Sequence, residues 1–276
     1  MESQSLTGIE GVRWVPDVPT GVAALVLAGS SGRVDSGRAR LLAQHGVVAE
    51  SVQWFGGAGQ SSGPYDVPLE LFLGRVADLA RENDTIVVVG TSFGSEAAML
   101  IGAHSPDVDA VVAFAPSDVV WAGVRPDGAT TSHWTFGGSP LPHVPFIDTW
   151  EPADDPPAFV TLYEESRRRS AAATSGPALP VEHIDRLVLV AGGDDQVWPS
   201  LEMARAIEAR RDAHGRGTTL VTDPRAGHRT VLPGEDPVVG GVRMRRDGTE
   251  EADRRLGRAA WPHVAALLRG PGATAD

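Results

Sequence analysis

Short, continuously apolar segments alternate with segments of helical pattern through most of this 276-residue chain. The apolar segments, which we predict to be strands, are 22–28, 47–54, 86–90, 108–115, 187–191 and 218–222. The predicted helices are 37–45, 69–83, 92–104, 199–213 and 251–269. Strands without a polar face must be covered on both sides, as in a parallel sheet. Strand alternating with helix is typical of a doubly wound α/β fold, so we predict one such domain over residues 1–276.

Residues 121–179 interrupt this alternation. The segment is rich in Pro and Gly and has one plausible helix, near residues 161–173. An irregular segment of this length inside a domain is usually either functional or disordered. Its aromatic residues provide enough apolar surface to pack over a site, and they include Trp134, Phe136, Phe146, Trp150 and Phe159. We therefore predict a lid-like insertion within the α/β domain.

The composition excludes several kinds of chemistry. The chain has no cysteine, and its 24 basic residues are all arginine. The missing thiol excludes disulfides, a cysteine nucleophile and sulfur-based metal sites, and the missing lysine excludes a Schiff base and a P-loop. The formal net charge of −12 opposes binding to nucleic acid. Because the first ten residues resemble no signal peptide and no apolar run could span a membrane, we expect a cytoplasmic protein without a membrane partner.

The strongest chemical signal is the sequence Gly90-Thr91-Ser92-Phe93-Gly94, which follows an apolar strand and opens a helix. This is the context of a nucleophile elbow, the defining turn of the α/β-hydrolase fold. Side chains at either glycine would collide with the neighbouring strand and helix. The N-terminus of the helix also favours a developing oxyanion. We predict Ser92 as the nucleophile, with an ordinary strand-to-helix turn as the alternative.

A serine hydroxyl needs a neighbouring base before it is an effective nucleophile. In α/β-hydrolases the acid and then the histidine follow the serine in chain order, each after a later strand. His228 follows the predicted strand 218–222 through a short loop in which Gly227 permits a tight turn. The other downstream histidines lie in or beside helices or ahead of a strand, and they are His183, His214 and His263. We therefore predict His228 as the base.

The acid should lie in the loop that follows the predicted strand 187–191. There, Gly192 and Gly193 end the strand, and Asp194 and Asp195 come next. The spacing after Gly192 favours Asp195 as the residue that orients the histidine. Asp194 is the alternative, with a turn-stabilising hydrogen bond as its other role.

The oxyanion hole needs two backbone donors. We predict the N–H groups of Phe93, at the helix start, and Ser30, in the Gly29–Gly32 loop after the first long strand. A plain Gly/Ser turn is the alternative for that loop. Glu96, in the first helical turn, is interpreted as structural, because acids are common at helix starts. As substrate-binding residues we predict Trp54, Trp134 and Trp198.

Several segments beyond the elbow resemble one family. They are GTSFGSEAAML, SHWTFGGSPLP, PVEHIDRLVLVAGGDDQVWPSLEMA, RAGH and EEADRRLGRAAWPHV, in order from about residue 21 to residue 269. Together they resemble the C-terminal catalytic domain of the acyl-CoA thioesterase and bile acid-CoA:amino acid N-acyltransferase family. The chain is also similar to dienelactone-hydrolase-like proteins. The resemblance implies an α/β-hydrolase whose triad is Ser92, Asp195 and His228.

Two departures from the family are visible. Animal members carry an N-terminal β-sandwich domain, for which we expect no room before residue 22. The N-acyltransferase branch has cysteine at the elbow, where this chain has Ser92. Serine esters are generally hydrolysed more readily, so the resemblance favours a thioesterase-like hydrolase over a conjugating enzyme.

We therefore predict a serine hydrolase that cleaves an acyl thioester, linked to coenzyme A or a carrier protein, or an ester. One alternative is an acyltransferase or cyclase in which an amine or carbon nucleophile captures the acyl group. Another is a hydrolase-like protein that binds a ligand without turnover. The phosphates of coenzyme A need a basic site, and candidates are Arg167, Arg168, Arg169, Arg225 and Arg229, although a solvated surface run is the favoured interpretation. No metal or other cofactor is predicted.

Overall fold

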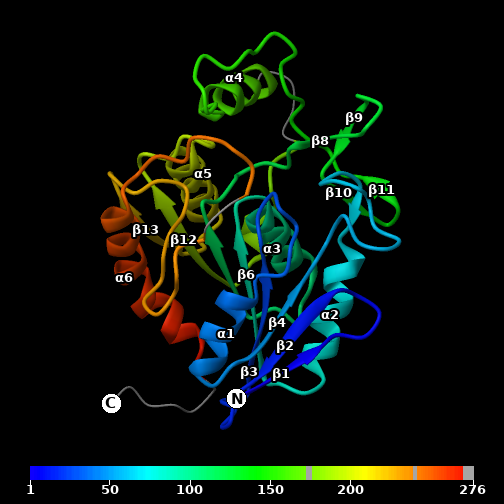
Figure 1. Ribbon diagram of the computed structural model, residues 1–276, viewed down its shortest axis with the longest axis vertical. Coiled ribbons are helices and arrows are strands. Elements are labelled where there is room, and N and C mark those ends of the chain that lie inside the picture. The colour runs from blue at the N-terminus through cyan, green and yellow to red at the C-terminus, as the bar shows by residue number, and fades with distance from the viewer. Residues whose placement is uncertain (172–175, 239–240, 270–276) are drawn as a thin grey trace.

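The computed structural model describes residues 1–171, 176–238 and 241–269. Within these residues the centre is an eight-stranded sheet in the order β1-β2-β4-β3-β6-β7-β12-β13 (Figure 1). The strands that pair in parallel are β3 (Val22–Leu27), β4 (Val48–Val52), β6 (Thr85–Thr91), β7 (Ala110–Phe114), β12 (Arg186–Gly192) and β13 (Thr219–Asp223). They coincide with the predicted strands, so the predicted parallel α/β sheet is confirmed.

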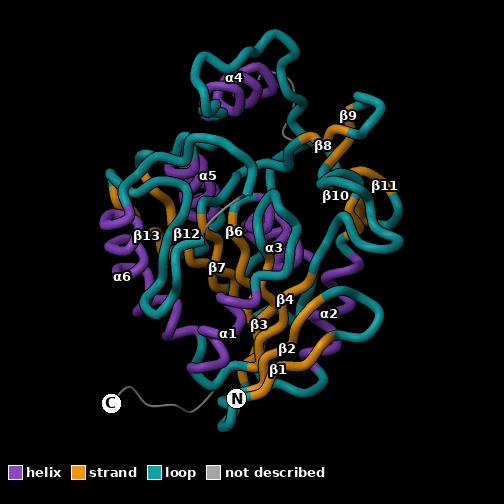
Figure 2. Tube along the Cα trace, in the orientation of Figure 1, coloured by secondary structure: helices purple, strands orange, loops and turns teal. Residues whose placement is uncertain are grey.

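Helices cover both faces of the sheet, as Figure 2 shows. One face is covered by α2 (Glu70–Ala80), α3 (Phe93–His104) and α5 (Ser200–Ala213). The other face is covered by α1 (Ser36–Gln44) and α6 (Glu250–Leu267). Successive side chains of β3 alternate between the two cores, and all of them are at most 1% exposed. Because side chains alternate along a strand, a strand covered on both faces has to be apolar throughout.

The two strands at one end of the sheet were not predicted from the sequence. β1 (Glu2–Ser5) pairs antiparallel with β2 (Gly11–Val15), which in turn pairs antiparallel with β4. None of the residues in β1 or β2 is fully buried. Both strands are short and neither has the continuous apolar run by which the buried parallel strands were predicted.

The predicted insertion contains regular structure. It holds β8 (Ala122–Val124), β9 (Thr130–Ser132), β10 (Trp134–Phe136), β11 (Ser139–Pro140) and α4 (Val160–Ala171). β10 pairs in parallel with β5 (Val67–Pro68), so the insertion is joined to the body of the domain by main-chain hydrogen bonds. α4 begins one residue before the predicted helix, and residues 172 and 173 of that prediction lie outside the described residues.

These elements lie beyond the carboxyl end of the central sheet (Figure 1). A short 3₁₀ helix, η1 (Val181–His183), leads from the insertion back into β12. In the described ranges, no helix is both long and apolar enough to cross a membrane.

Candidate active site

Ser92 lies at the sharp turn between β6 and α3. Its backbone angles are φ 57° and ψ −125°, a conformation that residues other than glycine rarely adopt. A Cβ atom on Gly90 would lie 2.0 Å from the carbonyl oxygen of Gly94, and one on Gly94 would lie 2.4 Å from the carbonyl oxygen of Ala28. Both contacts are with backbone and cannot be relieved by moving a side chain. The two glycines therefore let helix and strand approach closely enough to hold Ser92 in a strained turn.

His228 and Asp195 meet at the carboxyl ends of β12 and β13. The Nδ1 atom of His228 lies 2.8 Å from Oδ2 of Asp195, and both side chains are buried. The other carboxylate oxygen accepts hydrogen bonds from the N–H groups of Val197 at 2.9 Å and Trp198 at 3.3 Å. A carboxylate at Nδ1 favours the tautomer with its proton there, which leaves Nε2 able to accept a proton.

The structure also separates the two aspartates of the loop. Asp194 accepts a hydrogen bond from the N–H of Gly248 at 3.1 Å, and its own N–H donates to the carbonyl of Ala226 at 2.9 Å. Asp194 thus connects two loops, whereas Asp195 contacts the histidine.

Ser92 and His228 line the same cavity, which has a volume of about 370 Å³. Ser30 lines it as well, and the remaining walls come mainly from α1 and from residues between 229 and 246. The hydrogen bond of the His228 side chain within the described residues is to Asp195 rather than to Ser92. Such catalytic hydrogen bonds often form only when substrate binds. The cavity is therefore a place where a reacting carbonyl can reach both side chains.

The family model for BAAT / acyl-CoA thioester hydrolase C terminal matches residues 76–238, which is more than half of the chain. The chain belongs to this family. It is therefore an enzyme of the α/β-hydrolase class, related to esterases and thioesterases. No curated protein sequence matches the chain significantly.

Solved structures agree on the fold. A candidate dienelactone hydrolase from Klebsiella pneumoniae is 14% identical, with a TM-score of 0.50 and 97% of each chain covered. An acylaminoacyl peptidase from Pyrococcus horikoshii is 10% identical, with a TM-score of 0.56, and the match covers all of this chain and 42% of that one. Identities this low support the shared fold and leave substrate open.

Ser30 and Phe93, the two predicted oxyanion donors, have different surroundings in this protein. The loop that carries Ser30 touches the nucleophile, because a Cβ atom on Gly29 would lie 2.9 Å from Cβ of Ser92. The ring of Phe93 points elsewhere: it packs against His133, with 4.1 Å between ring centroids, and against Trp198, with 5.5 Å. Only the backbone of Phe93 is thus available for the predicted role.

The three tryptophans predicted to bind substrate lie in the interior. Trp54, Trp134 and Trp198 are at most 1% exposed, and none of them lines the described cavity. Trp54 and Trp134 pack against each other, with 5.1 Å between ring centroids. Trp198 donates its backbone N–H to Asp195 and its indole N–H to the carbonyl of Ala115. These large side chains fill core space, which argues against substrate contact, and their role in substrate binding stays a prediction.

Arginines that the sequence did not single out lie on the cavity wall. Arg33, Arg229 and Arg246 all line it, although only Arg229 was a predicted candidate. Arg229 donates to the carbonyl of Val238 at 2.5 Å, and Arg246 donates to the carbonyls of Val242 at 2.6 Å and Met244 at 3.2 Å. The carbonyls hold the Arg246 guanidinium in place without neutralising its charge.

The charges of these arginines act on one another. Burial, together with the charges of Arg246 and Arg33, lowers the pKa of Arg229 to about 10. The positive charge of Arg229 is therefore less stable here than in water. An anion bound in the cavity would relieve this cost. Neither sequence spacing nor composition pointed to Arg33 or Arg246, since the loops meet only in the folded chain.

The basic run of α4 has another role. Arg167 pairs with Asp118 at 2.6 Å and with Glu202 at 2.5 Å, while Arg168 and Arg169 lie 3.5 and 3.6 Å from Glu165. None of these arginines, nor Arg225, is among the described lining residues of the cavity. Among the residues that the structure describes, no cluster of three or more His, Asp or Glu side chains is placed to hold a metal ion.

Proposed function

We propose that this protein is a serine hydrolase that cleaves an acyl thioester, or an ester, through an acyl-enzyme on Ser92. One observation carries the proposal: the strained Ser92 and His228 line one cavity, and Asp195 is hydrogen-bonded to the buried side of that histidine. A strained backbone is retained where the surrounding structure enforces it, and such sites are commonly functional. Membership of the acyl-CoA thioester hydrolase family supports the same reaction class.

In the proposed reaction, Nε2 of His228 takes the proton of the Ser92 hydroxyl as Oγ attacks the acyl carbonyl. The N–H groups of Phe93 and Ser30 stabilise the oxyanion of the tetrahedral intermediate. The intermediate collapses with loss of the thiol or alcohol, which receives the proton from the imidazolium. Water, deprotonated by His228, then attacks the acyl-enzyme, and the carboxylic acid leaves as Ser92 is restored. Asp195 stays ionised and stabilises the positive imidazolium in both halves.

The cavity wall favours an anionic leaving group. The described wall has a net positive charge beside the proposed nucleophile and base, because five arginines, including Arg33, Arg229 and Arg246, line it against three acids, Asp35, Glu235 and Asp236. A thioester of coenzyme A, or of a phosphopantetheine carrier, bears phosphates that pair well with guanidinium groups. We therefore propose a thioester with a phosphate-bearing carrier as the preferred substrate over a neutral ester.

The test is a substrate panel on the wild type and on Ser92→Ala. The panel holds acyl-CoA, the matching acyl-pantetheine, which lacks phosphates, and a neutral p-nitrophenyl ester. We expect wild type to prefer acyl-CoA, and Ser92→Ala to lose on the order of 10³-fold or more in turnover of every substrate. Mass spectrometry of wild type quenched during turnover should detect an acyl adduct on Ser92, and Ser92→Ala should show none. Full activity in Ser92→Ala would exclude the mechanism.

Two further measurements address the alternatives. Adding amine acceptors such as glycine or taurine to the acyl-CoA assay distinguishes hydrolysis from acyl transfer, because a transferase would form the amide in place of the free acid. A fluorophosphonate probe reports whether the serine is activated at all. If folded wild-type protein left every serine unlabelled, the ligand-binding alternative would replace the proposed function.

A further inference from the structure

A second carboxylate is buried next to the elbow. Glu96 lies in the first turn of α3, one helical turn after Ser92, and its side chain is 0% exposed. Its Oε1 atom has no hydrogen-bond partner among the described residues. The sequence interpretation as an ordinary helix-start acid explains neither feature, because such acids lie in solvent, where they need no partner.

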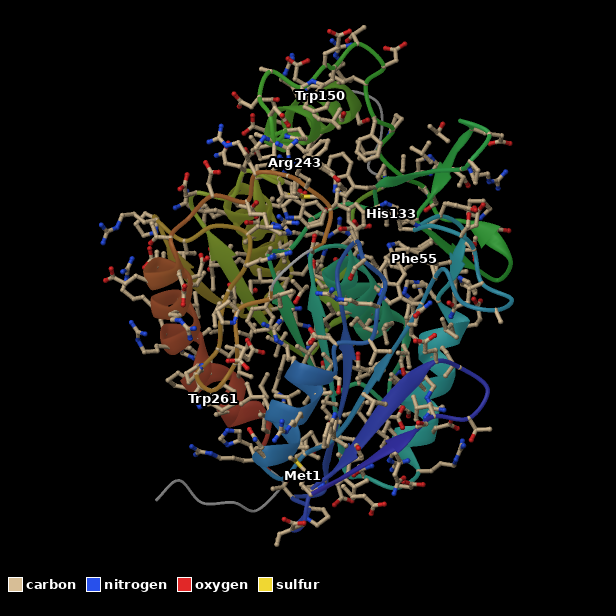
Figure 3. All side chains as sticks on the ribbon, in the orientation of Figure 1. Met1, Phe55, His133, Trp150, Arg243 and Trp261 are labelled. Atoms are coloured by element: carbon tan, nitrogen blue, oxygen red, sulfur yellow. The ribbon has the colours of Figure 1, made fainter. Side chains whose placement is uncertain are left out.

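The other carboxylate oxygen of Glu96, Oε2, contacts three polar groups of the insertion. Oε2 accepts from the indole N–H of Trp134 at 3.0 Å and from the backbone N–H of Trp121 at 3.3 Å. It also lies 3.3 Å from Nδ1 of His133, which is 2% exposed. Figure 3 labels His133 where the insertion meets the carboxyl end of the central sheet. One oxygen atom therefore ties the insertion to the helix that begins at the elbow.

This connection ends on Phe93, the residue that follows the nucleophile. The imidazole of His133 packs on one part of the Phe93 ring, at 4.1 Å between centroids. Trp198 packs on the same ring at 5.5 Å, and the backbone N–H of Trp198 donates to Asp195. Phe93 is thus held between a residue bound to Glu96 and a residue bound to the proposed catalytic acid.

We propose that Glu96 and His133 are positioning residues that fix the Phe93 peptide, and with it the N–H that stabilises the oxyanion. The inference rests on the proposed function, since it assigns the pair to the same reaction. Neither residue lines the described cavity, so both act through Phe93 rather than by touching substrate. Small displacements of a catalytic group cost rate steeply, which explains why the chain keeps a buried carboxylate here.

Glu50 shows what a buried carboxylate with a purely structural role looks like. It is also 0% exposed, but Arg75 donates to both of its oxygens, at 2.8 and 2.9 Å. Glu50 lies on β4 and is not among the described lining residues of the cavity. Glu50 therefore provides matched control variants for Glu96.

The experiment compares three variants of the full chain with wild type. Glu96→Leu removes the acceptor, Glu96→Gln keeps a carbonyl oxygen for the three donors, and His133→Phe keeps a ring against Phe93 but removes Nδ1. For hydrolysis of the p-nitrophenyl ester, we expect kcat to fall about 30-fold in Glu96→Leu and about 5-fold in His133→Phe. KM should stay within about twofold of wild type, and Glu96→Gln should recover most of the lost kcat.

A second measurement, inhibitor affinity, tests oxyanion stabilisation separately from substrate binding. Affinity for a trifluoromethyl ketone, which forms a tetrahedral adduct with the serine, should fall in parallel with kcat/KM, while inhibition by the carboxylic acid product stays unchanged. Glu50→Leu and Glu50→Gln should lower the thermal midpoint and leave kcat of the folded protein within about twofold of wild type.

The outcomes separate this inference from the proposed function. If a fluorophosphonate fails to label wild-type Ser92, both the proposed function and this inference are overturned. If wild type is labelled, but Glu96→Leu and His133→Phe react as fast as wild type and lose only stability, the positioning role alone is overturned. Should Glu96→Leu not fold, unchanged kcat and ketone affinity in folded His133→Phe would overturn it equally.

Discussion

Ser92 lies between two regions of different character, the cavity on one side and the insertion (residues 121–179) on the other. On the cavity side, α1 and the loop within residues 229–246 carry arginines, and they surround a space of about 370 Å³. On the insertion side, Trp121, His133 and Trp134 are at most 2% exposed and are tied to Glu96. In our proposals, the first side admits a charged ligand and the second holds the start of α3 in place. The comparison teaches that these two roles would need opposite degrees of openness around Ser92.

The insertion also supports the cavity side from a distance. Arg243 and Arg245 pair with Asp155 and Asp154 of the insertion, and the N–H of Arg245 donates to the carbonyl of Pro157 at 2.8 Å. Arg246, the next residue, instead lines the cavity. None of the described lining residues of the cavity comes from 121–179. The lid role of the insertion thus stays a prediction, while its contacts support both sides.

The largest expected effect comes from Asp195, where the two sides meet. Asp195→Asn should lower kcat by about 10³–10⁴-fold, because the amide no longer stabilises the imidazolium or the required tautomer. Steady-state hydrolysis of acyl-CoA measures it. Asp194→Asn is the matched control and should cost less than about tenfold, since within the described part of the chain its carboxylate accepts from Gly248 and does not contact His228. Equal losses in both variants would contradict the assignment of Asp195 as the acid.

Next in size is the ion pair that anchors α1 on the cavity side. Arg38 donates to Glu235 at 2.6 and 3.0 Å, and both side chains are at most 10% exposed. Glu235→Ala leaves a buried guanidinium without its partner and should cost about 3 kcal/mol of unfolding free energy. Urea denaturation measures this change. Glu202→Ala removes a carboxylate that is 62% exposed, and it should cost less than about 1 kcal/mol.

The same pair predicts a pH dependence. Burial alone would raise the pKa of Glu235, but the charge and hydrogen bonds of Arg38 hold it below its ordinary value of 4.5. A lowered folded pKa adds stability above the unfolded pKa, and this contribution is lost as the pH falls through the folded value. Thermal midpoints should therefore fall less steeply below about pH 4.5 in Glu235→Gln than in wild type. Identical slopes would show that Glu235 does not titrate with unfolding.

A smaller, substrate-dependent effect is expected at the cavity arginines. Arg229→Gln and Arg246→Gln should each raise KM for acyl-CoA about tenfold, because each removes a charge-assisted contact with phosphate. KM for acyl-pantetheine should stay within about twofold. Arg168→Gln, on the outer surface of α4, is the control and should change neither. An equal rise in KM for both substrates would argue for general damage to the cavity.

Arg246→Gln, which should weaken the binding of acyl-CoA, should at the same time raise the stability of the ligand-free protein. The charge of Arg246 is one reason why the pKa of Arg229 is lowered. Removing that charge relieves repulsion, so Arg246→Gln should be more stable than wild type by up to about 0.5 kcal/mol at pH 7. Urea denaturation of the ligand-free protein measures the change. A clear loss of stability would show that the hydrogen bonds of Arg246 to carbonyls outweigh the repulsion.

The smallest effect is expected at Trp54. Its indole nitrogen is buried without a hydrogen-bond partner among the described residues. Trp54→Phe removes that donor and some core volume, two changes that oppose each other, so stability should change by less than about 1.5 kcal/mol. Kinetics with acyl-CoA should show kcat and KM within about twofold of wild type. A large rise in KM would restore Trp54 as a substrate-contacting residue.

Sequence reasoning worked where local pattern and function coincide. The apolar segments predicted the parallel strands, which the structure confirms. The resemblance to the acyl-CoA thioesterase family is confirmed by the match to the family model. The same reasoning chose Ser92, Asp195 and His228. The fold brings Ser92 and His228 to one cavity and Asp195 to the histidine, and their catalytic roles are our proposal. It could not foresee the burial of the three tryptophans, because a large aromatic side chain in a loop gives the same sequence pattern whether it fills the core or binds a ligand.

By itself, the sequence determined the order of the parallel strands and main helices along the chain and the sharp turn at Ser92. Both follow from short-range physics: side-chain alternation sets the strands, and the lack of Cβ atoms at Gly90 and Gly94 permits the turn. Only the tertiary structure decided which arginines face the cavity and what surrounds Glu96. Arg33 and Arg246 are separated by most of the chain, and burial of Glu96 depends on the insertion returning to α3. Such contacts form by packing of distant segments, for which the sequence carries no local signal.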